Sequence, residues 1–185
     1  MKREPPSEVA RRAGVPSSAQ MIYSPDEIAG RVEAMGRDIS VHYADAGSLL
    51  VLGLLKGSFI FLADLVRAIR LPLQVDFLVA SSYGAGTVSS GEVKLRYDPA
   101  APMEGRHVLL VEDIVESGTT LERVLALIEA RNPASLQVCT LLHKRLNPGG
   151  AEVRWVGFDA PSDFLVGYGL DHAEEFRHLP FIASL

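Results

Sequence analysis

The residues best suited to chemistry lie close together in residues 108–121, whose sequence is VLLVEDIVESGTTL. An apolar run leads into the adjacent carboxylates Glu112 and Asp113, and the small, polar run ESGTT then precedes a helical pattern. Backbone N–H groups at the start of a helix point outward, the helix dipole favours an anion there, and hydroxyl groups add further donors. We therefore predict that the turn at residues 117–120 holds a monophosphate group.

The two carboxylates before this turn indicate a second kind of ligand group. Glu112 and Asp113 can accept hydrogen bonds from the hydroxyls of a polyol, or hold Mg²⁺ through water. A phosphate beside an acidic pair at the end of a strand suggests ribose 5-phosphate. The P-loop pattern G-x-x-x-x-G-K-[ST] does not occur, and the G-x-G at residues 167–169 lacks a third glycine. An ordinary helix start with solvated acids is the alternative interpretation.

Strands and helices must alternate along the chain to position these residues. Apolar runs predict buried strands at residues 49–55, 73–81, 107–111, 136–142 and 153–158, and a strand returning at 93–97 after the Gly- and Ser-rich segment 82–92. Helices are predicted from the capping signal SPDE at 24–27, after residue 58, and at 121–131. This order is typical of an α/β protein with a parallel sheet, which binds ligands at the carboxyl ends of its strands.

Composition limits the class of protein. The chain has 185 residues, is 48% hydrophobic and carries a net charge of −5, so we expect one domain at residues 21–185 and no nucleic-acid partner. No apolar run is long enough for a membrane span, and the polar residues 1–20 are expected to be a flexible tail. The single cysteine, Cys139, lies in an apolar run and is expected to be buried; it excludes an intrachain disulfide and fits a cytoplasmic protein. The five histidines show no metal-binding spacing.

Residues 108–121 resemble the phosphoribosyl pyrophosphate motif of the type I phosphoribosyltransferases. Further segments resemble the hypoxanthine-guanine branch in order and spacing: LLKGS at 54–58, SSYG at 81–84, LLHKR at 141–145, WVGF at 155–158, FLVGYGLD at 164–171 and RHLP at 177–180. The resemblance implies an α/β fold with a mostly parallel central sheet flanked by helices. It also implies a small hood made mainly from the N-terminal part and residues 150–185.

For the sugar and the phosphates, the resemblance implies contacts from several segments. Glu112 and Asp113 would bind the ribose hydroxyls, partly through Mg²⁺. The turn that would hold the 5-phosphate consists of Ser117, Gly118, Thr119 and Thr120. The residues that would bind pyrophosphate are Lys56, Gly57 and Arg177. A cis peptide is expected before Lys56, and Ser58 stands where the family commonly has glycine.

The other implied roles concern the base and the closing of the site. Lys144 would donate to the 6-oxo group of a purine, which adenine lacks. Phe164 would stack on the base, and the backbone of Leu165 would contact its 2-position edge. Asp171 would lie near the purine and bind a second Mg²⁺. The loop residues that would close over pyrophosphate and exclude water are Ser82 and Tyr83.

Glu116 departs from the family pattern, which usually has aspartate at this position. By the resemblance, the residue at this position handles the proton on purine N7 while N9 attacks C1 of the ribose. Glutamate and aspartate have similar intrinsic pKa values, so the acid–base chemistry is retained while the geometry changes. We predict that Glu116 is a catalytic residue of an active enzyme, with its rate and base preference left open.

The sequence thus predicts a purine salvage enzyme. It would convert hypoxanthine, guanine or both, with phosphoribosyl pyrophosphate and Mg²⁺, to IMP or GMP and pyrophosphate. The family associates, so a homodimer or homotetramer is expected. Two alternatives stay open: a transferase that prefers xanthine, and a non-catalytic nucleotide-binding regulator on the same fold, which only Glu116 motivates.

Overall fold

The computed structural model describes residues 6–82, 93–97, 99–145 and 150–185. The helices of this part are α1 (Pro6–Arg12), α2 (Pro25–His42), α3 (Phe59–Ala68) and α4 (Thr119–Glu129). The strands are β1 (Gln20–Tyr23), β2 (Leu49–Leu55), β3 (Leu73–Ser82), β4 (Val93–Tyr97), β5 (His107–Val115), β6 (Ser135–His143), β7 (Trp155–Asp159), β8 (Leu165–Val166) and β9 (Ile182–Ser184).

The larger of the two described sheets has the strand order β4-β3-β2-β5-β6-β7. The strands β3, β2, β5, β6 and β7 are mutually parallel. Strand β4 runs antiparallel to its neighbour β3 at the edge of the sheet. The predicted mostly parallel α/β sheet is therefore confirmed. Because β2, β5 and β6 are adjacent and parallel, the segments that follow them leave the sheet at the same edge.

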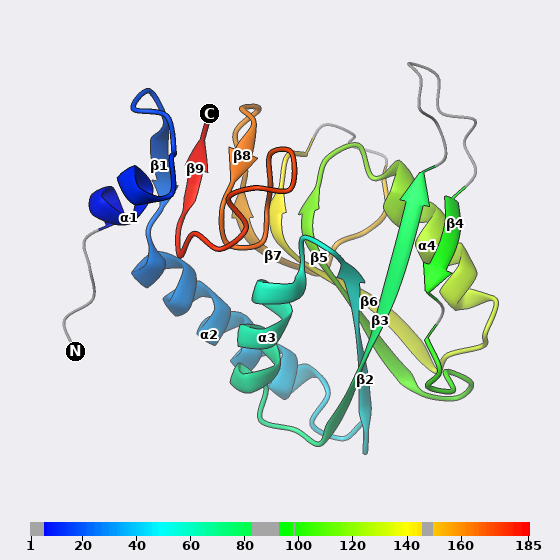
Figure 1. Ribbon diagram of the computed structural model, residues 1–185. Helices are drawn as coiled ribbons and strands as arrows, with labels where there is room; N and C mark the ends of the chain where they lie inside the picture. The colour runs from blue at the N-terminus through cyan, green and yellow to red at the C-terminus, as the bar shows by residue number, and fades with distance from the viewer. Residues whose placement is uncertain (1–5, 83–92, 98, 146–149) are drawn as a thin grey trace.

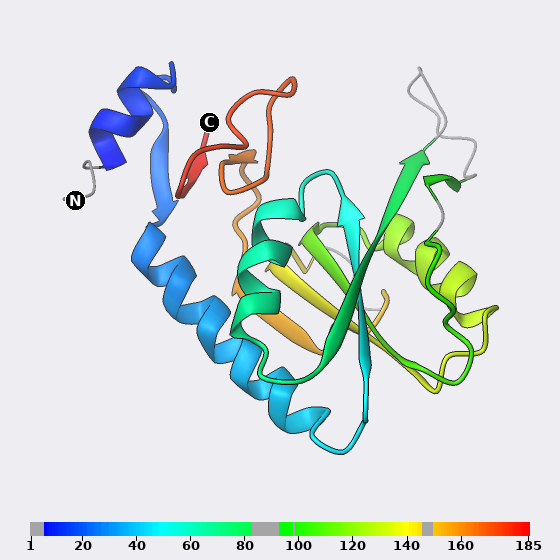
Figure 2. The ribbon, with the colours of Figure 1, turned by 60° about the horizontal axis from the view of Figure 1, so that its bottom comes forward.

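Both faces of this sheet are covered by helices, as Figures 1 and 2 show. Alternate residues of β2 point to opposite faces: Leu49 and Val51 pack with α2 and α3, whereas Leu50 and Leu52 pack with α4. A strand buried on both faces needs apolar residues at every position. This requirement explains the unbroken apolar run from which β2 was predicted. Cys139 is fully buried in the same core, and burial raises the pKa of its thiol, which makes it unfit as a nucleophile.

Helix α2 begins where the capping signal predicted. Ser24 is the N-cap, its hydroxyl accepts a hydrogen bond from the Glu27 backbone, and the Glu27 carboxylate accepts from the Ser24 backbone at 2.8 Å. The helix then packs along the sheet as far as β7, where Arg31 Nε donates to the Gly157 carbonyl at 2.8 Å. No helix in the described residues is long and apolar enough to cross a membrane.

A smaller antiparallel sheet of β1, β9 and β8 lies at the upper left of Figure 1, on the side toward which the carboxyl ends of β2 and β5 point. It joins residues near the two ends of the chain, as the resemblance implied for a hood. One segment expected there lies elsewhere: residues 155–158 form part of β7, at the edge of the larger sheet. Gly157 permits this close pairing, because a Cβ there would lie 2.4 Å from the Leu141 carbonyl oxygen.

The N-terminal segment differs from the tail that we predicted over residues 1–20. Within it, the structure places α1 at residues 6–12 and starts β1 at Gln20. Val9 and Val15 pack against a buried cluster that includes Phe176 and Phe181. The helix has only seven residues, too few for a hydrophobic period to be visible in the sequence.

Candidate functional site

The segments that carry the predicted chemistry meet at the carboxyl edge of the larger sheet. Lys56 follows β2, Glu116 follows β5 and Lys144 follows β6. The prediction for β5 was wrong in one respect, because the strand does not end at Val111 but continues to Val115. Glu112 and Asp113 therefore lie inside a strand rather than in a turn, and Glu112 pairs with Thr140 of β6.

The turn between β5 and α4 has the features of an anion site. Gly118 precedes the helix with φ +80°, a left-handed conformation that glycine adopts at no steric cost. Gly118, as the N-cap residue, makes no side-chain hydrogen bond to the start of α4, where the first backbone N–H groups have no partner within the helix. A cavity of about 310 Å³ adjoins this turn and is lined by Glu112, Ser117, Gly118 and Thr120, among others. The Ser117 hydroxyl lies 3.3 Å from that of Thr119.

The carboxylates of β5 lie in different surroundings. Glu112 lines the cavity beside the turn, and its removal from water, together with the charge of Asp113, raises the pKa of the Glu112 carboxyl well above its usual range. Asp113 lies against the loop after β2, where a Cβ added to Gly57 would be 1.7 Å from Asp113 Oδ2. On its other side, Gly57 lies against Gly169, because a Cβ added to Gly169 would be 2.0 Å from the Gly57 carbonyl oxygen. Three segments distant in sequence thus meet at Gly57.

Glu116 and Lys144 form an ion pair, with Lys144 Nζ 2.5 Å from Glu116 Oε1. The Lys144 side chain is 9% exposed, whereas that of Glu116 is 53% exposed. The backbone N–H of Lys144 also donates to the Val115 carbonyl at 2.9 Å, which ties the two segments together. A nearly buried ammonium and a more exposed carboxylate therefore stand side by side.

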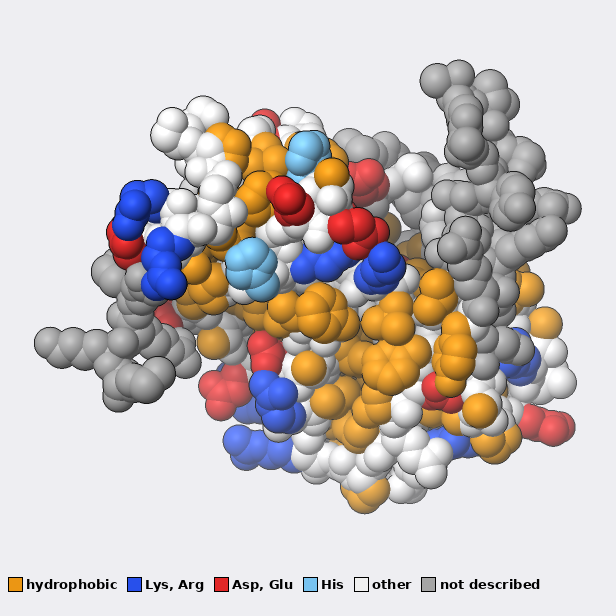
Figure 3. All heavy atoms as spheres, viewed as in Figure 1, with side chains coloured by type: hydrophobic (Ala, Val, Ile, Leu, Met, Phe, Trp, Pro, Cys, Tyr) orange, Lys and Arg blue, Asp and Glu red, His pale blue; other side chains and the backbone are white. Residues whose placement is uncertain are grey.

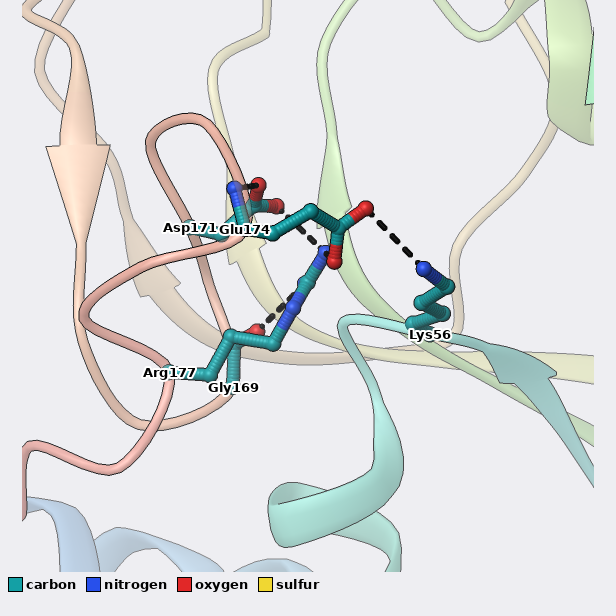
Figure 4. A network of polar contacts seen from close by, with 5 residues as sticks. All are labelled: Lys56, Gly169, Asp171, Glu174 and Arg177. Atoms are coloured by element: carbon teal, nitrogen blue, oxygen red, sulfur yellow. Dashed lines mark hydrogen bonds and ion pairs between the residues drawn. The ribbon is translucent and has the colours of Figure 1, made fainter.

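The loop after β2 and the C-terminal turn are joined by charged side chains (Figure 4). The peptide Leu55–Lys56 is cis, as the resemblance implied. Arg177 Nη2 lies 2.8 Å from Asp171 Oδ1, and Glu174 contacts both Lys56 and Arg177. Sequence reasoning missed Glu174, although it lies three residues from both Asp171 and Arg177 in one charged run. Nearby, Ser58 is fully buried and donates to the Leu54 carbonyl at 2.6 Å, so the serine fits where glycine is common.

The other predicted residues are placed as follows. Phe164 is 54% exposed, and its ring contacts that of His172 edge-on at 5.5 Å between centroids. Leu165 is a buried residue of β8 whose backbone pairs with Ser184 of β9. Ser82 ends β3, and Tyr83 and the rest of the predicted closing loop lie outside the described residues.

The carboxylates at this edge are hard oxygen donors of the kind that bind Mg²⁺, although they do not form one cluster. In the described part of the chain, no group of three or more His, Cys, Asp or Glu side chains is arranged to hold a metal ion. Such separation suits an ion that takes most of its ligands from substrate phosphates and water. A separate cavity of about 1100 Å³ lies between α2, α3 and the C-terminal segment, and none of the predicted site residues lines it.

Comparisons with known proteins give one consistent result. Residues 18–171 match the phosphoribosyl transferase domain family. The chain is similar to the hypoxanthine phosphoribosyltransferase of Salmonella typhimurium, with 46% identity over 86% of this chain and 90% of that protein. It is 44% identical to the hypoxanthine-guanine phosphoribosyltransferase of Dictyostelium discoideum, over 91% of this chain and 96% of that one. A crystal structure of the Staphylococcus aureus hypoxanthine phosphoribosyltransferase superimposes with a TM-score of 0.85 and 37% identity, covering 90% of each chain.

Proposed function

The chain belongs to the phosphoribosyl transferase domain family, among the hypoxanthine and hypoxanthine-guanine phosphoribosyltransferases, and we propose that it transfers the ribose 5-phosphate of phosphoribosyl pyrophosphate to a 6-oxopurine. The enzyme is a pentosyltransferase of purine salvage. Its substrates would be hypoxanthine, guanine or both, and its products IMP or GMP and pyrophosphate.

The ion pair between Lys144 and Glu116 is the observation that carries this proposal. A 6-oxopurine presents on one edge an acceptor, O6, beside N7, which carries a proton during the reaction. Lys144 can donate to O6, while the Glu116 carboxylate can accept the proton from N7. Adenine would present its amino donor to the buried ammonium of Lys144, and neither group could accept a hydrogen bond from the other. Because leaving buried polar groups unpaired costs free energy, the site should discriminate strongly against adenine.

The rest of the site suits phosphoribosyl pyrophosphate. The start of α4 offers backbone donors to the 5-phosphate through residues 117–120, and Glu112 and Asp113 can accept from the ribose hydroxyls. Lys56 and Gly57 lie in the β2 loop that Asp113 contacts, and Arg177 donates to the carbonyl of Gly169, which lies against Gly57. This grouping suits a pyrophosphate group on C1 of the same ribose. Phe164 offers an exposed ring for stacking, and Leu165 a backbone edge for the 2-position.

In the proposed reaction, purine N9 attacks C1 of the ribose, a C1–N9 bond forms, and the bond from C1 to the pyrophosphate oxygen breaks with its electron pair. Lys56 and Arg177 neutralise the departing pyrophosphate, and Glu116 takes up the proton released from the base. Ser82 and Tyr83 would exclude water as the loop closes. Glu112, Asp113 and Asp171 are the residues that would hold Mg²⁺, which would supply neutralisation of phosphate charge.

We also propose that the protein associates with copies of itself. Phe59, Val75 and Phe77 are 44%, 41% and 36% exposed, and Figure 3 shows apolar side chains gathered beside α3. Phe77 of β3 and Leu62 of α3 lie on the same face of the sheet, because a Cβ added to Gly53 of β2 would contact both side chains. An exposed apolar patch of this kind marks an interaction surface. Cytoplasmic location stays a prediction.

A turnover assay with phosphoribosyl pyrophosphate, Mg²⁺ and hypoxanthine, guanine, xanthine or adenine tests the function. We expect nucleotide formation with hypoxanthine or guanine, none with adenine, and loss of turnover when EDTA removes Mg²⁺. A Lys144→Gln variant should lose most activity with hypoxanthine. Faster turnover of xanthine than of the other bases would favour the xanthine-preferring alternative, and IMP binding without any turnover would favour the nucleotide-binding regulator.

A further inference from the structure

The C-terminal turn places a carboxylate between two cations of the proposed pyrophosphate site. Glu174 Oε1 accepts from Lys56 Nζ at 2.9 Å, and Glu174 Oε2 accepts from Arg177 Nη2 at 3.1 Å (Figure 4). We propose that Glu174 competes with substrate: its carboxylate occupies Lys56 and Arg177 in the free enzyme and is displaced when the pyrophosphate group binds. This inference rests on the proposed function, because it takes both cations as pyrophosphate ligands.

The backbone of the turn presents Glu174 in this position. Its N–H donates to Asp171 Oδ2 at 2.8 Å, and its φ of +69° lies in the left-handed region, which residues other than glycine adopt uncommonly. Paired backbone hydrogen bonds of 3.3 and 3.0 Å between His172 and Glu175 close the turn around it. The side chain then reaches Lys56, which lies 118 residues earlier in the chain. The contact therefore joins the C-terminal segment to the loop after β2.

The chemistry of the contact explains why it can be exchanged. Carboxylate and phosphate oxygens both accept charge-assisted hydrogen bonds from ammonium and guanidinium groups. Pyrophosphate offers more oxygens and more negative charge than one carboxylate, so it can replace Glu174 on both cations. The side chains of Lys56 and Glu174 are each 64% exposed, so the pair they form is open to water and weak.

Arg177 does not depend on Glu174 for its position. Its side chain is 18% exposed, and it is also held by Asp171 Oδ1 at 2.8 Å and by the Gly169 carbonyl, which accepts from Nη1 at 2.8 Å. When Glu174 leaves, the guanidinium therefore stays directed at the site. Lys56, by contrast, is released to follow the incoming anion.

The competition should appear as a lower affinity for pyrophosphate and its ribosyl derivative. A ligand that binds only the fraction of protein with free cations has its apparent affinity reduced by that fraction. Exposed ion pairs shift such equilibria by about two- to five-fold. Neutralising Glu174 should strengthen binding by about this factor, without any change at the purine side of the site.

The experiment compares the wild type with Glu174→Gln and with Glu175→Gln, which removes the charge of the adjacent exposed carboxylate. Inorganic pyrophosphate with MgCl₂ is titrated into each free protein by calorimetry, and KM is measured for both substrates. For Glu174→Gln we expect a dissociation constant for pyrophosphate and a KM for phosphoribosyl pyrophosphate that are each lower by about two- to five-fold. The KM for hypoxanthine should not change, and Glu175→Gln should match the wild type. A Glu174→Asp variant keeps the charge and should stay nearer to the wild type.

Pyrophosphate binding that is equal or weaker in Glu174→Gln would overturn the inference, and so would an equal gain in Glu175→Gln. The calorimetric titration needs neither base nor turnover. A wild-type protein that binds pyrophosphate but converts no purine would refute the proposed function, while the two glutamine variants would still decide whether Glu174 competes.

Discussion

Glu116 provides the most direct test of the chemistry at the level of single residues. Its carboxylate lies 2.5 Å from Lys144 Nζ and is the group that would take up the proton from the base. Glu116→Gln keeps the shape of the side chain but cannot accept that proton as readily. Because general acid–base catalysis contributes 10²- to 10⁴-fold, we expect kcat with hypoxanthine to fall at least about 10²-fold in a spectrophotometric assay. Glu116→Asp should retain turnover. A glutamine variant as fast as the wild type would remove Glu116 from the proton transfer.

His143, at the end of β6, should make stability depend on pH. Burial and the charge of Arg145 lower the pKa of His143 below its ordinary value. The charge of Asp159 raises this pKa, but by less than the other two effects lower it. The unfolded chain therefore takes up a proton at higher pH than the folded chain, so stability falls as the pH drops through the free-histidine value of about 6.5. We expect Tm to decrease between about pH 7.5 and 5.5, and to decrease less in His143→Gln. An NMR titration that gives His143 a pKa above about 6.5 would contradict this.

Sequence reasoning identified most residues that the structure brings to the carboxyl edge, but not their contacts. The predicted roles of Lys144 and Glu116 came from separate segments, and only the adjacency of β5 and β6 brings the two side chains into an ion pair. Glu174 was missed because a charged residue in a polar turn has no local feature that distinguishes it from a solvated one. Its partner Lys56 is far away in the sequence, and long-range contacts of this kind require the fold.

The loop between β2 and α3 connects several parts of the site through Gly57. A methyl group there would overlap Asp113 Oδ2, so Gly57→Ala must displace either the carboxylate or the loop. Since a shift of about 1 Å can cost on the order of 10²-fold in rate, we expect kcat/KM for phosphoribosyl pyrophosphate to fall by roughly that factor. Gly30→Ala in α2 is the matched control, because no atom lies within 4 Å of its added Cβ, and it should keep full activity. Wild-type kinetics in Gly57→Ala would mean that the close approach is not required.

Elements were predictable where one local signal dominated. The capping box fixed the start of α2, and the doubly buried β2 could be predicted from its unbroken apolar run. The end of β5 was not predictable, because Glu112 and Asp113 look like turn residues in isolation. Strand pairing with β6 overrides that local preference. Within the strand, Glu112 lines the cavity beside the turn and Asp113 lies against the β2 loop.

At the scale of the whole molecule, the order of strands and helices indicated the large sheet, and resemblance indicated a hood. The small sheet pairs β1 near the start of the chain with β9 at its end, and no local pattern could specify that register. For the same reason α1 was not foreseen: Val9 and Val15 find their apolar partners, Phe176 and Phe181, only in the folded protein.

The exposed apolar patch beside α3 makes a prediction about association. Phe77 is 36% exposed in the patch, and an aromatic anchor of an interface contributes about 1–2 kcal/mol, so Phe77→Arg should raise the dissociation constant by about 5- to 30-fold. Sedimentation velocity over a range of concentrations should show the wild type as an oligomer and the variant shifted toward monomer. Leu127→Arg is the matched control, because Leu127 is 39% exposed and belongs to α4, which packs on the opposite face of the sheet, and it should leave association unchanged. If both variants sediment like the wild type, the patch beside α3 is not the surface through which the chains associate.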